Sequence, residues 1–342
     1  MVQPHSPHPR LVIRGIPISP CVILAPMAAV THAPFRRICR EIGNVGLVCT
    51  EQISTAALHY SSERTERMLR WSAAEKPLSV QLFGADPAMM AAATVRVVDE
   101  GADIVDINMG CWVPKVCRQG AGAALLRDAE QARRVVGAVL AVSRVPVTVK
   151  MRAGWSPDSL TSLGLAHDLE AMGVAAFTLH GRTADQGFEG QADWRWIADF
   201  RRSLRVPVIG NGDIRSPEDA LRMIGSTHCH GVMVGRAAIG NPWLLDRIGR
   251  ALQGRAPATA PALEERAAVA LRHARELVVI MGELPAIRHL RGLLPHYVQG
   301  LHGASRLREG MVRACTLGDV ERLFEEISTL RQAPEVQGGP AD

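Results

Sequence analysis

The chain has 342 residues, of which 47% are hydrophobic and 21% charged, the balance of a globular protein with a large core. Its formal net charge is +5, which permits a polyanionic partner without requiring one. No apolar run reaches membrane-spanning length, and the first residues lack the apolar stretch of a signal peptide, so we expect a cytoplasmic protein with no membrane segment. Seven scattered cysteines without Cys/His ligand spacing predict free thiols and no metal site.

Short apolar runs recur along the chain, with helix-patterned segments between them. Eight buried strands that alternate with helices predict a parallel sheet covered by helices, and the number eight fits an α/β fold of the (β/α)8 TIM barrel type. A doubly wound open sheet is the alternative. The runs cover residues 22–27, 45–51, 77–84, 104–111, 145–152, 175–182, 206–213 and 230–237.

The strand signal stops after residue 242, and the remaining periodicity is helical. The segment QGRAPATAPA over 253–262 has the composition of a linker. We therefore predict a catalytic TIM barrel over 19–252 and a small C-terminal helical domain over 263–331. The segments 1–18 and 332–342 are expected to be flexible tails.

The carboxyl ends of the predicted strands carry a set of mostly polar residues. On a barrel those ends meet at one rim, where active sites are built, so the whole set predicts a lined pocket rather than isolated loop residues. The set comprises Met27, Glu51, Gln81, Asn108 with Cys111, Lys150 with Arg152, His180 with Arg182, Asn211 with Asp213, and Gly235 with Arg236.

The last two strands end in the glycine-rich segments VIGNGDI and VGRAAIGNPW. Backbone N–H groups there can approach an anion closely, as in barrels that hold a phosphate at this place. A phosphate-binding site in a chain that lacks a full dinucleotide-binding motif favours FMN as the ligand, lying across the barrel mouth. Lys150 is one of only three lysines in an arginine-rich chain, and its charge is expected beside the reduced flavin ring. Gln81 and His180 could bind the ring or the ribityl chain.

Cys111 follows a predicted strand in the stretch DINMGC, within a loop that Gly110, Gly120 and Gly122 flank. The loop contains no histidine that could activate a nucleophilic thiol. A thiol without such activation is mostly protonated at neutral pH, which suits a proton donor. Cys117, six residues further on, is the competing candidate.

The chain resembles the tRNA-dihydrouridine synthase family, most of all its bacterial B-type branch. The resemblance runs over nearly the whole length. It rests on APMAAVTHAPFRR (25–37), TEQ (50–52), VQLFGADP (80–87), DINMGC and KVCRQGAGAALLRD (106–128), VTVKMRAGW (147–155), LHGRTADQGFEGQADW (179–194), VIGNGDI (208–214), VGRAAIGNPW (234–243) and IRHLRGLLPHYVQGLHGASRLR (287–308).

The resemblance implies FMN-dependent reduction of tRNA uridines, in the D-loop, to 5,6-dihydrouridine, with NADPH or NADH as the electron donor. Hydride from the flavin would add at C6 of uracil, and Cys111 would protonate C5. Asn108 and Arg152 would hold the uracil. The implied FMN contacts are Pro26, Met27, Ala28, Gln81, Lys150, His180, Asn211, Gly212, Asp213, Gly235 and Arg236.

Two positions depart from the family pattern. Trp112 stands where proline usually follows the cysteine, which could shift the loop or let the indole stack on the base or the flavin. His32 stands where an acidic residue is usual, and no reason for it is evident from the sequence.

The helical segment is the expected platform for tRNA, in a monomeric protein. A cluster of basic residues there can track phosphates, although such a face is often only solvated. The cluster comprises Arg288, Arg291, Arg306, Arg308 and Arg313 with His289, His296 and His302, against Glu309 alone.

Two other functions are compatible with the same residues. One is an FMN barrel that acts on a free pyrimidine, which would leave the basic helical segment without a role. The other is a non-catalytic RNA-binding protein on a barrel that has lost its activity, which would not take up FMN.

Overall fold

The computed structural model describes residues 9–329 and 331–332. The chain forms two compact units. The first runs to Ala238 and also takes in Leu244–Ala258, and the second combines Ile239–Trp243 with the chain from Thr259 onward. The short excursion at 239–243 was not anticipated from the sequence.

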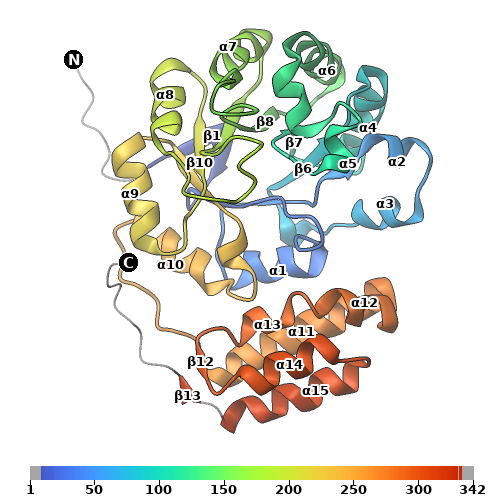
Figure 1. Ribbon diagram of the computed structural model, residues 1–342, viewed down its shortest axis with the longest axis vertical. Helices are drawn as coiled ribbons and strands as arrows, with labels where there is room; N and C mark the ends of the chain where they lie inside the picture. The colour runs from blue at the N-terminus through green and yellow to red at the C-terminus, as the bar shows by residue number, and fades with distance from the viewer. Residues whose placement is uncertain (1–8, 330, 333–342) are drawn as a thin grey trace. The chain divides into compact units, whose positions relative to one another are not determined.

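The first unit is built on a closed barrel of parallel strands (Figure 1). Neighbouring strands follow chain order, and pairing of Val48 with Leu78 joins β4 to β6 and closes the ring. A two-residue strand, β5 (Ile53–Ser54), pairs with β6 beyond β4. The barrel is formed by β3 (Val22–Leu24), β4 (Leu47–Cys49), β6 (Leu78–Phe83), β7 (Ile104–Met109), β8 (Val147–Arg152), β9 (Ala176–His180), β10 (Val208–Asn211) and β11 (Gly231–Val234). All eight predicted strands and the TIM barrel are confirmed, and the open sheet is excluded.

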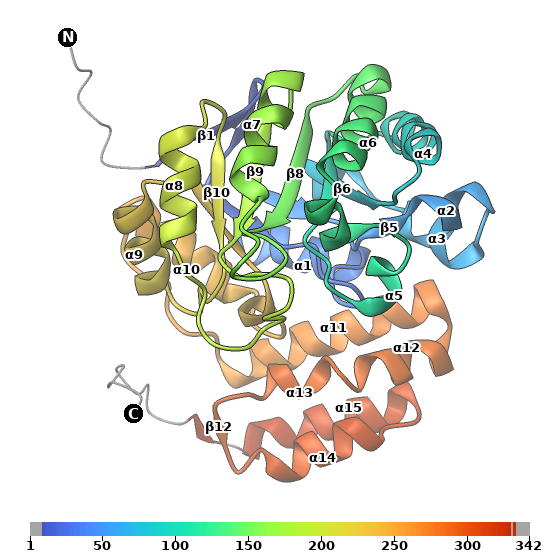
Figure 2. The same ribbon diagram turned by 45° about the horizontal axis from the view of Figure 1, so that its top comes forward.

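Helices surround this barrel on its outside (Figure 2). Several begin at side chains that cap the free backbone N–H groups of the first turn, namely Asp86 before α4, Asp128 before α6 and Ser216 before α9. The helices are α1 (Ala33–Glu41), α2 (Thr55–His59), α3 (Glu63–Met68), α4 (Pro87–Asp99), α5 (Pro114–Cys117), α6 (Ala129–Val142), α7 (Ser162–Met172), α8 (Arg195–Ser203), α9 (Pro217–Thr227) and α10 (Trp243–Leu252). Short 3-10 turns cover Ala73–Glu75, Gly122–Arg127 and Arg236–Ala238.

The expected flexible tail over 1–18 is wrong for its described part. Strands β1 (Leu11–Ile13) and β2 (Ile16–Ile18) form an antiparallel hairpin. Its two-residue turn has positive φ at both Arg14 and Gly15, the geometry that matches the twist of paired strands. Leu11, Ile13 and Ile18 are almost fully buried among residues at the amino ends of the barrel strands. Two three-residue strands next to prolines are too short to stand out by pattern. Residues 1–8 lie outside the described residues.

This hairpin closes the amino end of the barrel, so truncating its buried side chains is expected to be costly. We predict that Ile13→Ala lowers the free energy of unfolding by about 2–4 kcal/mol, because it removes a buried side chain and leaves a cavity. Denaturant titration of Ile13→Ala beside Val12→Ala, whose side chain is exposed, measures the difference. Equal stability of the two variants would mean that the segment is a tail after all.

The second unit is helical. Helix α11 begins at Leu263 and ends at Met281, and its buried face includes His273, which is hydrogen-bonded to Tyr297 at 2.9 Å. The unit also contains α12 (Glu283–Leu290), α13 (Leu294–Tyr297), α14 (Ser305–Arg313), α15 (Leu317–Glu325) and a 3-10 turn over Glu326–Thr329.

A small strand pair ends the second unit. Strand β12 (Leu301–His302) pairs with β13 (Arg331–Gln332), so Gln332 is part of a strand rather than the start of a tail. The rest of the expected tail, 333–342, lies outside the described residues. None of the described helices is both long enough and apolar enough to cross a membrane.

Candidate active site

The register of the strands brings the predicted polar residues to common levels inside the barrel mouth. Asn108 of β7 pairs with Lys150 of β8, and Arg152 of β8 pairs with His180 of β9. His180 in turn pairs with Asn211 of β10. Parallel pairing therefore places side chains from four successive strands on one rim, as the sequence predicted.

A chain of side-chain amides runs inward from this rim. Asn108 Nδ2 donates to Gln81 Oε1 at 2.7 Å, and Gln81 Nε2 donates to Asp106 Oδ2 at 2.6 Å. The other carboxylate oxygen of Asp106 accepts from Thr148 Oγ1 at 2.6 Å. Burial raises the pKa of Asp106, while these two hydrogen bonds and the charge of Lys150 oppose the rise. Gln81 therefore lies in the barrel floor with both ends of its amide bonded.

The loop that carries Cys111 is anchored to the same network. Asn108 Oδ1 accepts from the backbone N–H groups of Gly110, at 3.0 Å, and Cys111, at 2.9 Å. Gln52, just beyond β4, accepts from Asn108 Nδ2 at 3.2 Å and approaches Cys111 Sγ with its own Nε2 at 3.5 Å. The thiol is therefore held at the rim, partly exposed, beside β7.

Asn108 has no hydrogen-bonding capacity to spare. Its two N–H groups and both lone pairs of its oxygen are used by the bonds just described. A contact with uracil would have to displace one of them. The predicted role of Asn108 in holding the substrate stays a prediction.

Lys150 lies at the centre of the rim, where Nζ donates to Asn211 Oδ1 at 3.2 Å. Asn211 is itself fixed by a bond from Nδ2 to the carbonyl of Met233 on β11. Burial, with help from the nearby charge of Arg152, lowers the pKa of Lys150 to about 8. Burial and Arg182 likewise lower the pKa of Arg152 to about 10.

A second cluster follows β9. Arg182 is 1% exposed and donates from Nη2 to Asp213 Oδ2 at 2.9 Å and to the carbonyl of Gly190 at 2.6 Å. Its Nη1 lies 3.2 Å from His180 Nε2. Because burial and four neighbouring cations lower the pKa of His180 well below its ordinary value, this nitrogen accepts the bond. His180 is therefore neutral and keeps its Nδ1–H for another partner.

The two glycines at the strand ends expected to bind phosphate differ in their surroundings. Gly212 has φ of 120°, and a Cβ there would lie 2.7 Å from Cβ of Ala192, so no other residue fits. A Cβ at Gly235 would meet Ala25 and Met27 only at 3.7–3.8 Å, so its backbone is approachable. Pro26, Met27 and Ala28 form the loop after β3, which a bond from Ala25 N to the carbonyl of Val234 holds beside Gly235.

An aromatic ring covers the cations at this mouth. The guanidinium of Arg236 lies 4.0 Å from the ring centroid of Phe188, and that of Arg152 lies 5.7 Å from it. Trp112, the residue in the usual place of proline, meets the same ring edge-on at 6.0 Å. Both aromatic side chains are more than a third exposed. They therefore form an exposed apolar surface next to Cys111.

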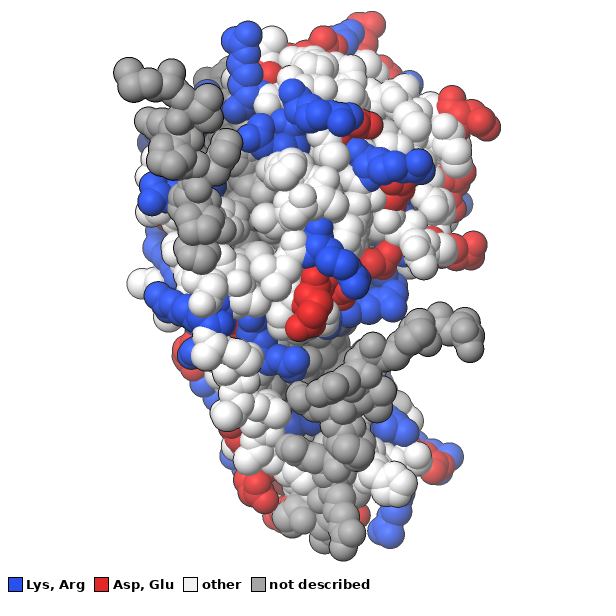
Figure 3. Space-filling view, turned by 90° about the vertical axis from the view of Figure 1, so that its left-hand side faces the viewer, with Lys and Arg blue, Asp and Glu red and all other residues white. Residues whose placement is uncertain are grey.

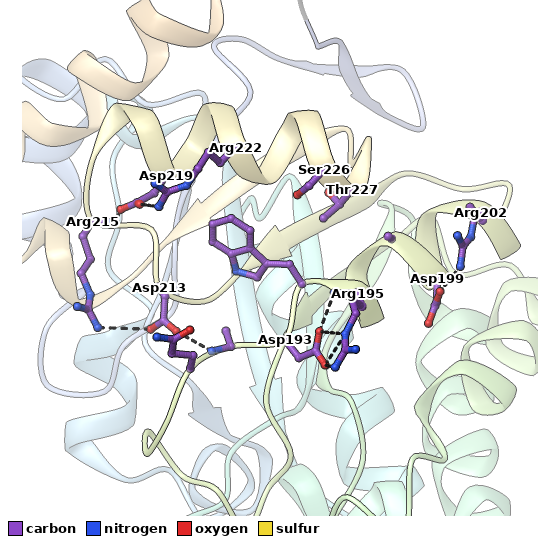
Figure 4. A pocket seen from close by; sticks show the side chains of 14 residues that line it. Asp193, Arg195, Asp199, Arg202, Asp213, Arg215, Asp219, Arg222, Ser226 and Thr227 are labelled. Carbon is purple, nitrogen blue, oxygen red and sulfur yellow. Dashed lines mark hydrogen bonds and ion pairs between the residues drawn. The ribbon is translucent and has the colours of Figure 1, made fainter. Parts of the chain in front are cut away.

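A separate cavity of about 1100 Å³ opens between α8 and α9 (Figure 4). Four arginines line it, and each has a carboxylate partner: Arg195 with Asp193, Arg202 with Asp199, Arg215 with Asp213, and Arg222 with Asp219. Figure 3 likewise shows basic and acidic side chains interspersed on this side of the barrel unit. The cavity therefore carries no excess charge, and Lys150 and Cys111 do not line it.

Three residues of the mouth were not among the predicted site residues. Arg182 was noted only as a strand-end residue, and its pairing with Asp213 was not foreseen. Gln52 follows Glu51 in TEQ, and nothing in its local pattern points to Cys111. Phe188 lies in the irregular segment 181–194, where no periodicity can reveal which side chain faces the barrel.

Fold and site together define a (β/α)8 barrel with a thiol and several cations gathered at the carboxyl ends of its strands, the arrangement of a barrel enzyme. The dihydrouridine synthase family model matches residues 23–332. The chain belongs to this family.

Named relatives extend over most of the chain. It is 39% identical over 287 residues to tRNA-dihydrouridine synthase B of Pseudomonas aeruginosa. The matched region covers 84% of this chain and 86% of that protein. It is 37% identical over 354 residues to a probable tRNA-dihydrouridine synthase of Mycobacterium tuberculosis strain H37Rv, with 98% and 91% covered. Among solved structures, histamine dehydrogenase from Rhizobium sp. 4-9 superposes with a TM-score of 0.53 at 14% identity, over 78% of this chain and 50% of that one, which is a likeness of fold.

Proposed function

We propose that this protein reduces specific uridines of tRNA, in the D-loop, to 5,6-dihydrouridine, with FMN as its cofactor and NADPH or NADH as the electron donor. The observation that carries the proposal is the position of Cys111, anchored through Asn108 at the same rim as Lys150. Membership of the dihydrouridine synthase family and the names of the relatives support the same activity. The proposal includes a cytoplasmic location and a monomeric protein.

The charge of the mouth fits a phosphate-bearing cofactor. Lys150, Arg152, Arg182 and Arg236 lie close enough to lower one another's pKa or that of His180. Asp213 is shared between Arg182 and Arg215, so its single negative charge does not neutralise these four cations. An anion would relieve this repulsion. The residues that would hold FMN are Pro26, Met27, Ala28, Gln81, Lys150, His180, Asn211, Gly212, Asp213, Gly235 and Arg236.

Bound FMN would supply the hydride that reduces C6 of the uracil ring. The protein supplies the remaining chemistry. Cys111 gives its S–H proton to C5 of the base from the rim. Lys150 places a positive charge at the barrel mouth, where it would stabilise negative charge on a bound flavin. Nε and Nη1 of Arg152 donate to the carbonyls of Gly110 and Thr183, whereas its Nη2 makes no hydrogen bond among the described residues. It is the group we assign to the uracil. Asn108, predicted for the same role, would have to exchange one of its four hydrogen bonds for a contact with the base.

The second unit is the proposed contact for tRNA. Arg288, Arg306 and Arg313 are exposed there. Arg306 and Arg313 pair with Glu326 and Glu309, so they would exchange these carboxylates for phosphates on binding. Arg291 has an internal role, because its Nε donates to the carbonyl of Ala314 at 2.8 Å. The target uridine must leave its stack to reach the barrel mouth.

The direct test is reduction of an unmodified tRNA transcript by the purified, FMN-loaded protein. With NADPH or NADH present, mass spectrometry of digested tRNA is expected to show dihydrouridine at a D-loop position, and comparing the two donors gives the preference. Free uridine and uracil should remain unreduced, because they lack the contacts to the helical unit. Reduction of free uracil at the rate of tRNA would favour the pyrimidine reductase instead. Failure to take up FMN would favour a non-catalytic RNA-binding protein.

A further inference from the structure

The orientation of the side-chain amides around Cys111 is determined by the backbone. Backbone N–H groups can only donate, so the two that point at Asn108, from Gly110 and Cys111, require the carbonyl oxygen of its amide to face them. The NH2 group of Asn108 then faces the opposite way. It donates to Gln81 and to Gln52, and both must present their carbonyl oxygens to it.

The same logic fixes the far end of each glutamine. Gln81 turns its NH2 group to Asp106, whose carboxylate accepts the bond. Gln52 turns its NH2 group to Cys111 Sγ at 3.5 Å. The sulfur is therefore an acceptor from Gln52, and the S–H bond is left to point elsewhere. No alternative assignment of the Gln52 amide satisfies Asn108.

We propose that Gln52 is a further catalytic residue, which donates a hydrogen bond to Cys111 Sγ and stabilises the sulfur when it loses its proton. The proposal rests on the proton-donor role assigned to Cys111. As the S–H bond breaks, the proton forms the new C–H bond at C5 of the base and the electron pair stays on sulfur. Water later returns a proton to the thiolate. A donor already aimed at Sγ lowers the energy of that charge. Asn108 is a positioning residue, because its bond to Gln52 Oε1 turns the NH2 group of Gln52 toward the sulfur.

Two substitutions separate the donor from the rest of the side chain. Gln52→Met keeps the volume and removes both polar ends. Gln52→Glu keeps the oxygen that accepts from Asn108 and replaces only the NH2 group facing Sγ with a negatively charged acceptor. Gln52 is partly exposed, so both variants should fold. The other groups that influence Cys111, namely Lys150, Arg152 and Cys117, are the same in both.

The first readout is alkylation of Cys111 by iodoacetamide as a function of pH, followed on its peptide by mass spectrometry in the FMN-loaded protein without tRNA. Losing a donor to the thiolate should move the midpoint of the alkylation curve upward by about 1 pH unit in Gln52→Met, and further in Gln52→Glu. The exposed Cys315 of the second unit is an internal reference and should alkylate alike in all three proteins. Equal midpoints in wild type and both variants would overturn the proposal.

The second readout is catalysis. Single-turnover reduction of tRNA should fall about 10-fold in Gln52→Met, with KM for tRNA and oxidation of NADPH without tRNA unchanged. An altered KM with an unchanged maximal rate would overturn the proposal, because it would make Gln52 a binding residue. If the protein does not act on tRNA at all, the proposed function fails. The alkylation midpoints of the three proteins still decide whether Gln52 donates to the sulfur as described.

Discussion

Replacing Cys111 by alanine is expected to abolish dihydrouridine formation while leaving the rest of the enzyme intact. Cys111 is the proposed proton donor to C5, and removing a positioned general acid costs about 10²–10⁴ in rate. FMN binding should survive, because the described contacts of Cys111 are to Asn108, Gln52 and its own loop. The measurement pairs dihydrouridine yield by mass spectrometry with the rate of NADPH oxidation in the absence of tRNA.

The matched control is Cys117→Ala, in the same loop. Cys117 Sγ donates to the carbonyl of Cys111 at 3.4 Å and is part of α5, so its removal changes the loop without removing the acid. We expect this variant to stay active. If Cys117→Ala were inactive and Cys111→Ala active, the proton donor would be the competing thiol, and the role of Cys111 would be wrong.

Replacing Lys150 by methionine is expected to slow the enzyme strongly and, at the same time, to stabilise the cofactor-free protein. The loss of the charge beside the cofactor should reduce turnover about 100-fold, a typical effect of removing one electrostatic group from an active site. The gain in stability follows from burial, which lowers the pKa of Lys150 to about 8 from its ordinary 10.5.

The sign of the stability effect follows from proton binding. Between pH 8 and 10.5 the unfolded chain holds the lysine proton more tightly than the folded protein, so wild-type stability rises with pH across this window. At pH 7 the ammonium is charged in both states and the burial penalty is present in full. Lys150→Met should therefore unfold with a free energy about 3 kcal/mol higher at pH 7, and the difference from wild type should shrink toward pH 10.5.

The control for Lys150 is Lys76→Met. Lys76 lies away from the mouth, 44% exposed by side chain, and pairs with Asp103 at 3.0 Å. Its loss should leave turnover unchanged, since exposed pairs contribute little. A Lys150→Met variant that turns over like wild type, or whose cofactor-free form is less stable at pH 7, would contradict the placement of a half-buried charge at the mouth.

The barrel could be predicted because parallel strands buried on both faces leave a strong signal. A run such as Val208–Asn211 is a short buried stretch that ends in a polar residue. The rim followed from topology alone, since carboxyl ends of parallel strands must meet. The hairpin at 11–18 was missed because two three-residue strands carry almost no periodicity, and their burial depends on the open amino end of a barrel formed later in the chain.

The connections within the site could not be predicted, for a different reason. Gln52 and Cys111 are 59 residues apart, and the closed barrel brings Gln52, just beyond β4, within reach of Asn108 at the end of β7. Arg182 and Asp213 are likewise 31 residues apart, in the loops that follow the neighbouring strands β9 and β10. A sequence pattern reports which residues end strands, whereas hydrogen-bond partners depend on rotamers and register.

The measurement that tests the whole account most directly is a crystal structure of the FMN-loaded protein. The account predicts the phosphate at the backbone N–H groups of Gly212 and Gly235, the ring beside Lys150, and Cys111 Sγ at the edge of the space left for a base. Flavin bound instead in the cavity between α8 and α9, with the barrel mouth closed to it, would contradict the account.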